Sequence, residues 1–367
     1  MTPRRPLPAP VEYALIPLVN LLASLVVAAG VLALIGADPL DALGSMAEGA
    51  VGSAEAWGYT LYYATNFILT GLAVALPFHA GLFNIGGEGQ ATMGGLGVAL
   101  VCLGFGGYSL WLVLPLAIAA AMLCGAAWAA VPAWLQARRG SHLVITTIMF
   151  NFLAAALMTY LLVDVLRVPG NGSPETRVFD PSAFLPPMDA LLGLLGVPFP
   201  STPLNISLLL ALMIALLFWV LVWHTRWGYE IRAVGHSPDA ARYAGISISR
   251  VILASVMLGG ALAGLVAVNE VMGVHHRLFL GFSNGYGFVG IAVALMGRNH
   301  PLGIVLAAVL FGALYQGGTE LAFDHPEITR EIVVVVEGLV ILFCGAFENA
   351  FRGPIEALFG RTGAKPA

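Results

Sequence analysis

Lysine is almost absent from this 367-residue sequence, because Lys365 is its only copy. The phosphate-binding loop of P-loop ATPases needs a lysine directly after a glycine-rich run. No such loop can exist here, so the chain is not a P-loop ATPase by itself. Cysteine is also scarce. Its three copies, Cys102, Cys124 and Cys344, lie in apolar runs and predict packing, with no disulfide framework and no metal site.

Charged residues are few as well. They make up 10% of the chain, whereas soluble domains carry about 25%. Hydrophobic residues reach 59% and the mean hydropathy is +0.89. These values predict an all-α polytopic membrane protein. Apolar windows predict ten transmembrane helices, at residues 13–35, 59–78, 85–105, 110–131, 143–163, 204–223, 251–272, 280–296, 302–322 and 332–347.

The placement of Lys and Arg predicts the orientation in the membrane. With a cytoplasmic N-terminus and ten crossings, twelve of the 16 Lys and Arg residues fall inside. Those that fall outside are Arg167, Arg177, Arg277 and Arg330. Because cytoplasmic loops are enriched in these residues, both termini are predicted to be cytoplasmic. The connection 168–203 is then external, and its prolines predict either an ordered, non-helical cap or a simple spacer.

Residues 81–90, GLFNIGGEGQ, place a carboxylate, two amides and four glycines between two apolar segments. An ionisable group at membrane depth is a functional hypothesis by default. Backbone that is not helical is tolerated in a bilayer only where protein covers it or water reaches it. Asn84, Glu88 and Gln90 are therefore predicted to line a solute pathway. The alternative is that these groups bond one another and neighbouring helices.

Further polar residues lie inside predicted spans. Thr147 and Asn151 are four residues apart, so they share one helix face and are predicted to line the same pathway. Glu270 lies near the end of its predicted span, where exposure at the membrane interface is expected.

A weak internal repeat supports this interpretation. The pattern Gly81-x-x-Asn84-x-x-Gly87 recurs as Gly281-x-x-Asn284-x-x-Gly287, where the predicted eighth span begins. Five spans per half would give the halves opposite orientations, as in many transporters. The sequence thus predicts two inverted five-helix repeats with broken third and eighth helices, and it adds Asn284 to the pathway residues.

The internal loop 225–250 contains a short helix with a signal at each end. Ser237 is a good N-cap, Pro238 suits the first helical position and Gly245 suits a left-handed C-terminal cap. A helix over residues 238–244 is predicted. Such a short helix ordinarily needs tertiary contacts, so docking to another protein is one interpretation and a plain surface turn is the other.

These motifs carry a resemblance to a known family. Residues 81–90, with Arg232-Ala-Val-Gly235 and Ala240-Ala-Arg-Tyr-Ala-Gly245-Ile246, closely resemble inner-membrane permeases of bacterial ABC importers. The branch is that of simple sugars and nucleosides, which includes ribose-type permeases and those linked to BMP lipoproteins. The resemblance implies that helix 238–244 couples the permease to an ATPase. The implied coupling residues are Gly235, Ser237, Pro238, Asp239, Ala240, Ala241, Arg242, Tyr243 and Gly245.

The resemblance also implies the partners. They are an ATP-binding subunit, usually with two fused cassettes, a second and different permease, and a periplasmic or lipoprotein solute-binding protein. The chain would be a multi-pass protein of the bacterial cytoplasmic membrane, in contact with lipid and not with nucleic acid. It is expected to form one permease domain over residues 1–367. This comprises a first half at 11–167, the external loop at 168–203 and a second half at 204–350.

The predicted function is translocation of a nucleoside or simple sugar, with ATP hydrolysed on a partner chain. No nucleophile–base pair or metal site has suitable spacing, so neither an enzymatic activity nor a cofactor is expected. The alternative is a proton-coupled secondary transporter that uses Glu88 or Glu270 as the relay.

Overall fold

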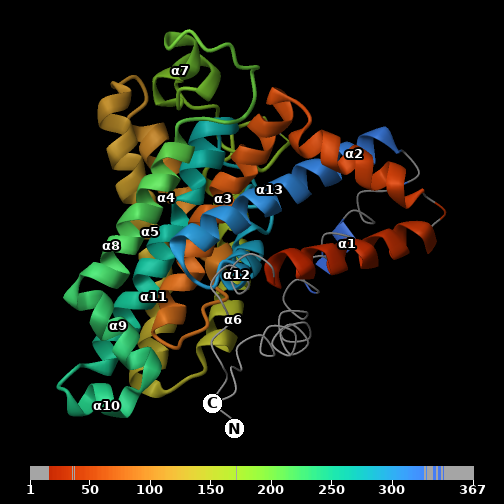
Figure 1. Cartoon of the computed structure of the whole chain (residues 1–367). Coiled ribbons are helices and arrows are strands. Elements are labelled where there is room, and N and C mark those ends of the chain that lie inside the picture. The colour runs from red at the N-terminus through yellow and green to blue at the C-terminus, as the bar shows by residue number, and fades with distance from the viewer. Residues whose placement is uncertain are drawn as a thin grey trace, which may run out of the picture. The chain divides into compact units, whose positions relative to one another are not determined.

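The computed structural model describes residues 16–34, 36, 38–170 and 172–325, with six isolated positions between 328 and 342. Within these residues the fold is helical and has no β-strand, only the isolated bridges Glu175–Phe279 and Pro187–Asn205. The chain divides into two compact units (Figure 1). Unit 1 comprises Met1–Ala56 and Leu314–Ala367, and unit 2 comprises Trp57–Ala313.

Unit 2 is a bundle of long apolar helices joined by short ones. Its long helices are α3 (Ala54–His79), α4 (Gly87–Gly104), α5 (Leu110–Arg139), α6 (Leu143–Tyr160), α8 (Ser207–His224), α11 (Ile248–Gly264), α12 (Tyr286–Met296) and the first part of α13 (Pro301–Asp324). The rest of α13, from Leu314, belongs to unit 1. The shorter ones are η2 (Leu161–Val165), η3 (Pro181–Ala183), α7 (Met188–Leu194), α9 (Arg226–His236), α10 (Pro238–Tyr243) and η4 (Val268–Val274). Figure 1 shows α7 at one end of this bundle and α10 at the opposite end; we call these the α7 end and the α10 end.

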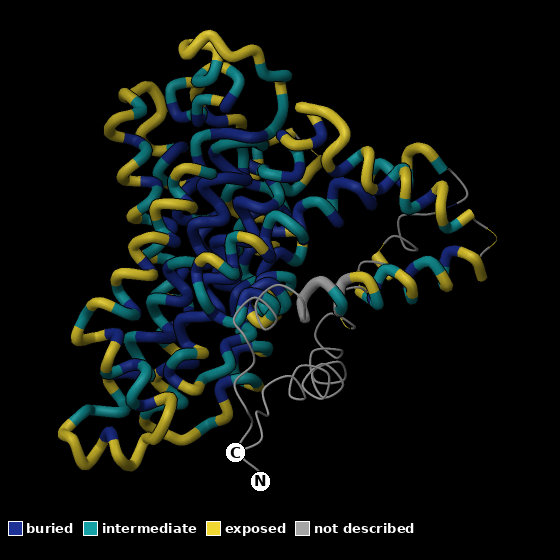
Figure 2. The backbone as a smooth tube through the Cα atoms, in the orientation of Figure 1, coloured by how far each residue is buried: buried dark blue, intermediate teal, exposed yellow. Residues whose placement is uncertain are grey.

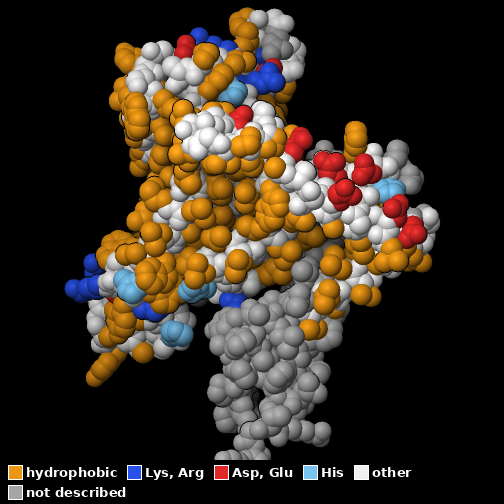
Figure 3. Space-filling view, turned by 45° about the horizontal axis from the view of Figure 1, so that its top comes forward, with side chains coloured by type: hydrophobic (Ala, Val, Ile, Leu, Met, Phe, Trp, Pro, Cys, Tyr) orange, Lys and Arg blue, Asp and Glu red, His pale blue; other side chains and the backbone are white. Residues whose placement is uncertain are grey.

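Six helices among the described residues are long and apolar enough to cross a membrane. They are Ala54–His79, Leu110–Arg139, Leu143–Val165, Ser207–His224, Ile248–Val274 and Pro301–Asp324. Each corresponds to a predicted span. Hydrophobic side chains accordingly cover most of the side of unit 2 (Figure 3).

The other four predicted spans are not among these six. The predicted third and eighth spans correspond to α4 and to α12, which has only 11 residues. The predicted first span contains α1 (Ile16–Leu34). The predicted tenth, at 332–347, lies largely outside the described residues. Ten crossings therefore remain a prediction.

Helix α3 is the central helix of unit 2. Of its most apolar stretch, 83% is buried, compared with 22% for α5, 17% for the helix that contains α6 and 28% for α8. Figure 2 shows the same contrast, with the buried backbone inside the bundle and exposed residues along its outer helices. The apolar outer faces suit contact with lipid tails.

The connection between η2 and α8 is ordered and lies at the α7 end. The N–H of Thr176 donates to the Leu278 carbonyl (2.9 Å) and that of Phe179 donates to the His276 carbonyl (2.8 Å). The segment packs on residues 276–279 as an ordered cap would, but α7 makes part of it helical, so the prediction of a non-helical cap is wrong in this respect. Burial lowers the pKa of His276, whose ring stacks on Phe184.

Unit 1 contains a helix between the first two predicted spans that was not itself predicted. Helix α2 (Pro39–Val51) begins where Asp38 accepts the N–H groups of Leu40 (2.9 Å) and Asp41 (3.4 Å). Within this unit α2 packs closely on α13, because a Cβ at Gly317 would meet the Met46 carbonyl.

Close helix contacts in unit 2 depend on glycine. A Cβ on Gly125 of α5 would overlap the carbonyl oxygen of Gly260 on α11. A Cβ on Gly94 of α4 would overlap Gly264. Small residues let membrane helices approach to backbone contact, where van der Waals packing holds them together.

Gly125→Ala is expected to destabilise the protein by about 1–3 kcal/mol, because the added methyl group forces α5 and α11 apart. Gly104→Ala is the matched control, since nothing lies within 4 Å of its Cβ position. Thermal unfolding of both variants in detergent measures the difference. Equal melting temperatures would contradict the packing argument.

Candidate functional site

Two helices begin side by side in the interior of unit 2 and run to opposite ends. A Cβ on Gly87, the first residue of α4, would lie 3.3 Å from the Gly287 carbonyl oxygen. Helix α4 continues to the α7 end, where the N–H of Gly107 donates to Ser182 (3.0 Å). Helix α12 continues to the α10 end, where the Asn299 carbonyl contacts His79 (2.9 Å). Glycine at both starts is required because a side chain would separate the two helices.

Glu88 joins the two helix starts. Its Oε1 accepts the Ser283 hydroxyl (2.6 Å) and the Gly285 N–H (3.1 Å), and its Oε2 accepts the Gly287 N–H (3.0 Å). The first N–H groups of a helix lack partners within it and carry partial positive charge. A carboxylate from α4 therefore caps α12.

The side-chain amides of the two predicted pathway residues Asn84 and Gln90 hydrogen-bond each other. Asn84 Nδ2 donates to Gln90 Oε1 (3.1 Å), and Asn84 Oδ1 accepts from Gln90 Nε2 (3.3 Å) and from the Gly86 N–H (2.9 Å). Both side chains are buried, with 1% exposure. These bonds hold the turn that precedes α4. This is what the alternative predicted, in which the polar groups bond one another and neighbouring helices.

Helix α6 supports the same turn. Asn151 Oδ1 accepts the Gly89 N–H (2.9 Å), and its Nδ2 donates to the Ile85 carbonyl (2.9 Å). Thr147 Oγ1 accepts the Ile85 N–H (3.3 Å). Main-chain groups outside a helix need such partners inside a membrane.

Asn284 lies between two of the groups that bond Glu88. Its backbone is left-handed, with φ +44°, and its N–H donates to the Gly281 carbonyl (3.0 Å). The side chain is exposed. The structure thus brings all six predicted pathway residues together around the two helix starts. Ser283 and Gly285 were not predicted from the sequence. The only signal for them was that they are the chain neighbours of Asn284.

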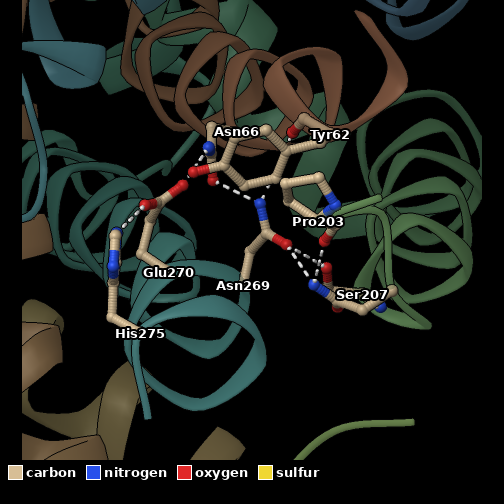
Figure 4. Close-up of polar contacts among 8 residues, drawn as sticks. Tyr62, Asn66, Pro203, Ser207, Asn269, Glu270 and His275 are labelled. Carbon is tan, nitrogen blue, oxygen red and sulfur yellow. Dashed lines mark hydrogen bonds and ion pairs between the residues drawn. The ribbon is translucent and has the colours of Figure 1, made fainter. Parts of the chain in front are cut away.

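A second polar cluster in unit 2 is centred on the π-helix η4 (Figure 4). Glu270 accepts from Asn66 Nδ2 (2.6 Å), and its other oxygen lies 3.4 Å from His275 Nε2. Asn269 donates to Asn66 (2.9 Å) and accepts from Ser207 (2.7 Å). Glu270 is 1% exposed. The expectation that it is exposed is therefore wrong.

The predicted short helix in loop 225–250 is present as α10. Ser237 Oγ accepts the Ala240 N–H (3.3 Å), Arg242 and Asp239 lie 3.4 Å apart, and Gly245 has φ +81°. Ala241 is buried, whereas the Tyr243 side chain is 98% exposed.

Gly235 connects α10 to the rest of the site. It lies in the last turn of α9, and a Cβ there would overlap the His79 carbonyl at the end of α3. A Cβ on Gly81 would lie 3.5 Å from the Gly235 Cα. The segment that leads to Glu88 therefore begins, at Gly81, in contact with α9, the helix that directly precedes α10.

Comparison with known proteins identifies the class to which this fold and site belong. The model of a family described as branched-chain amino acid transport system / permease component matches residues 57–345. The chain belongs to this family and is a permease subunit of an ABC transporter. Membership does not support the proton-coupled alternative.

Three relatives resemble it over most of their length. A glucose ABC transporter permease protein of Haloferax volcanii is 36% identical over 99% of this chain and 95% of its own. A guanosine ABC transporter permease protein of Bacillus subtilis is 33% identical over 90% and 93%. A nucleoside ABC transporter permease protein of Lactococcus lactis is 33% identical over 90% of each. No solved structure matches.

Proposed function

We propose that this chain is the permease subunit of an ABC importer that moves a nucleoside or a simple sugar across the cytoplasmic membrane. The carrying observation is its similarity to glucose, guanosine and nucleoside permeases over at least nine-tenths of its length. The finer topology belongs to the same proposal: ten crossings in two inverted halves, with the α10 end and both termini cytoplasmic.

The pathway is proposed to run past the two helix starts. The α4 and α12 starts meet and run to opposite ends, as expected of broken helices in inverted repeats. Helix N-termini attract anions, but the Glu88 carboxylate already occupies that of α12. This electrostatic balance favours an uncharged solute over an anionic one. Asn84, Gln90, Thr147 and Asn151 shape the pathway by fixing its backbone, and exposed Asn284 is the residue most accessible to solute.

Coupling is proposed to pass through α10. An ATP-binding subunit, with two fused cassettes, would dock on the exposed face that includes Tyr243. Movement of α10 would reach α3 through the contact of Gly235 with His79, and residues 81–90 through the contact with Gly81.

Two further partners are proposed, a second permease and an external solute-binding protein. The second permease is supported by the relatives. Bacillus subtilis has another guanosine permease, 29% identical to this chain over 261 residues. Lactococcus lactis and Haloferax volcanii likewise each have a second, more distant relative, at 28% and 29% identity.

The test is uptake by proteoliposomes that contain the two permeases, the ATP-binding subunit and the binding protein. Uptake of labelled guanosine or glucose is expected to need ATP, and phosphorylated analogues should not compete. Titration of the binding protein with nucleosides and sugars identifies the solute. Uptake that persists without the ATP-binding subunit and stops when the proton gradient is dissipated would contradict the proposal.

A further inference from the structure

A cavity at the α10 end of unit 2 combines cationic and apolar walls. It has a volume of about 560 Å³ and lies between α9 and the start of α11. Arg226, Trp227 and Arg250 line it together with apolar residues such as Leu253 and Met257. Figure 3 shows arginine side chains at this end of unit 2 beside hydrophobic surface.

A second, apolar cavity also borders α11. It has a volume of about 380 Å³, and all but one of its lining residues are hydrophobic. Thr225 and Leu258 line the second cavity, whereas their chain neighbours Arg226 and Met257 line the first. The first cavity lies nearer the start of α11, and we call the two cavities together the groove. From Arg250 to Leu262 the lining residues of α11 span about 18 Å, slightly more than the ~15 Å depth of one leaflet's hydrocarbon.

Both arginines lie at the ends of apolar spans, where lipid headgroups are expected. Arg226 follows the span Ser207–His224 by two residues, and Arg250 lies two residues inside the span Ile248–Val274. Trp227, 56% exposed, is of the residue type that favours this interface. Basic pockets between transmembrane helices at the cytoplasmic side suit anionic headgroups.

The cations are available for a ligand. Arg226 uses its Nε–H for Glu230 (3.2 Å), and its side chain is 90% exposed. Among the described residues, neither its Nη groups nor the exposed Arg250 side chain has another hydrogen-bonding or ionic partner. Arg226, Arg250 and Glu230 together give this end of the groove a net charge of +1.

We propose that this groove binds an anionic phospholipid. Its phosphate lies between Arg226 and Arg250, and one acyl chain lies along α11 in the apolar cavity. The site is separate from the solute pathway, so it does not depend on which solute is transported.

The test uses Trp227 as a local probe in the full-length protein, reconstituted in nanodiscs. Its fluorescence is obtained by subtracting the signal of the Trp227→Phe variant. Phosphatidylglycerol with brominated chains is expected to quench Trp227 more strongly than brominated phosphatidylcholine. Arg226→Ala with Arg250→Ala should lower this preference by about 25-fold, about fivefold for each arginine. Arg226→Lys with Arg250→Lys, which keeps both charges, should retain most of it.

Two further variants separate this site from general surface charge. Arg138→Ala with Arg139→Ala removes the same charge from the last turn of α5, outside the groove, and should leave the preference unchanged. Ala254→Phe should reduce quenching by both lipids while leaving the arginines in place. Equal loss in the control pair, unchanged quenching in Ala254→Phe, or loss of quenching when the ATP-binding subunit joins would each overturn the proposal.

Discussion

Glu88→Ala is expected to reduce ATP-driven uptake at least about 10-fold, which corresponds to about 1.4 kcal/mol. The reason is that the Ser283 hydroxyl and the N–H groups of Gly285 and Gly287 lose their shared acceptor. A hydrogen bond to a charged group contributes about 1.5–3 kcal/mol, and buried donors without a partner are costly. The measurement is initial uptake rate in proteoliposomes with all subunits present.

Conservative variants distinguish capping from general damage. Glu88→Gln keeps one acceptor oxygen and should be less impaired than the alanine variant. Ser283→Ala removes one donor and should have a smaller effect still. Glu55→Gln changes an exposed carboxylate at the start of α3 and is the control. Normal uptake and coupled ATPase activity in Glu88→Gln would contradict a role for the charge.

Ala241→Pro is expected to abolish coupling between ATP hydrolysis and uptake. The Ala241 N–H donates to the Ser237 carbonyl (3.0 Å), and proline removes this bond from a helix of only six residues. Proline inside a helix costs about 3 kcal/mol or more, which so short a helix cannot tolerate. Co-purification with the ATP-binding subunit and the ATPase rate of the complex measure the effect.

The control for this prediction is Gly193→Pro, which places proline in α7 at the opposite end of unit 2. No atom lies within 4 Å of its Cβ position. This variant should still assemble with the ATP-binding subunit and hydrolyse ATP at the normal basal rate. Transport driven normally by ATP in Ala241→Pro would show that α10 is not the coupling element.

Local sequence patterns predicted the parts of the fold that local physics determines. Ser237, Pro238 and Gly245 specified both ends of α10, because caps act within one turn. The glycines of residues 81–90 indicated a helix break, and α4 does begin at Gly87. Asp38 and Pro39 are equally good start signals for α2, but it lies between two apolar windows, and a search for membrane spans does not detect it.

Contacts between distant residues could not be predicted. Glu88 and Ser283 are 195 positions apart, so nothing near Glu88 indicated that its partners are the first N–H groups of another helix. Glu270 was misplaced for a related reason. Its position near a span end suggested exposure, whereas it is buried and bonded to Asn66 of α3.

The contact of Gly235 with the end of α3 has a consequence for the speed of switching. Gly235 and Gly81 meet through main-chain atoms, and neither contributes a side chain. A displacement of α9 at this contact therefore needs no rotamer change of either glycine. The barrier to the motion then arises elsewhere, where the buried side chains of Ile231 and Val234 on α9 pack. A bulkier residue at Gly235 would overlap the His79 carbonyl and push α9 away from α3, and this effect would appear in turnover rate before it appears in solute affinity.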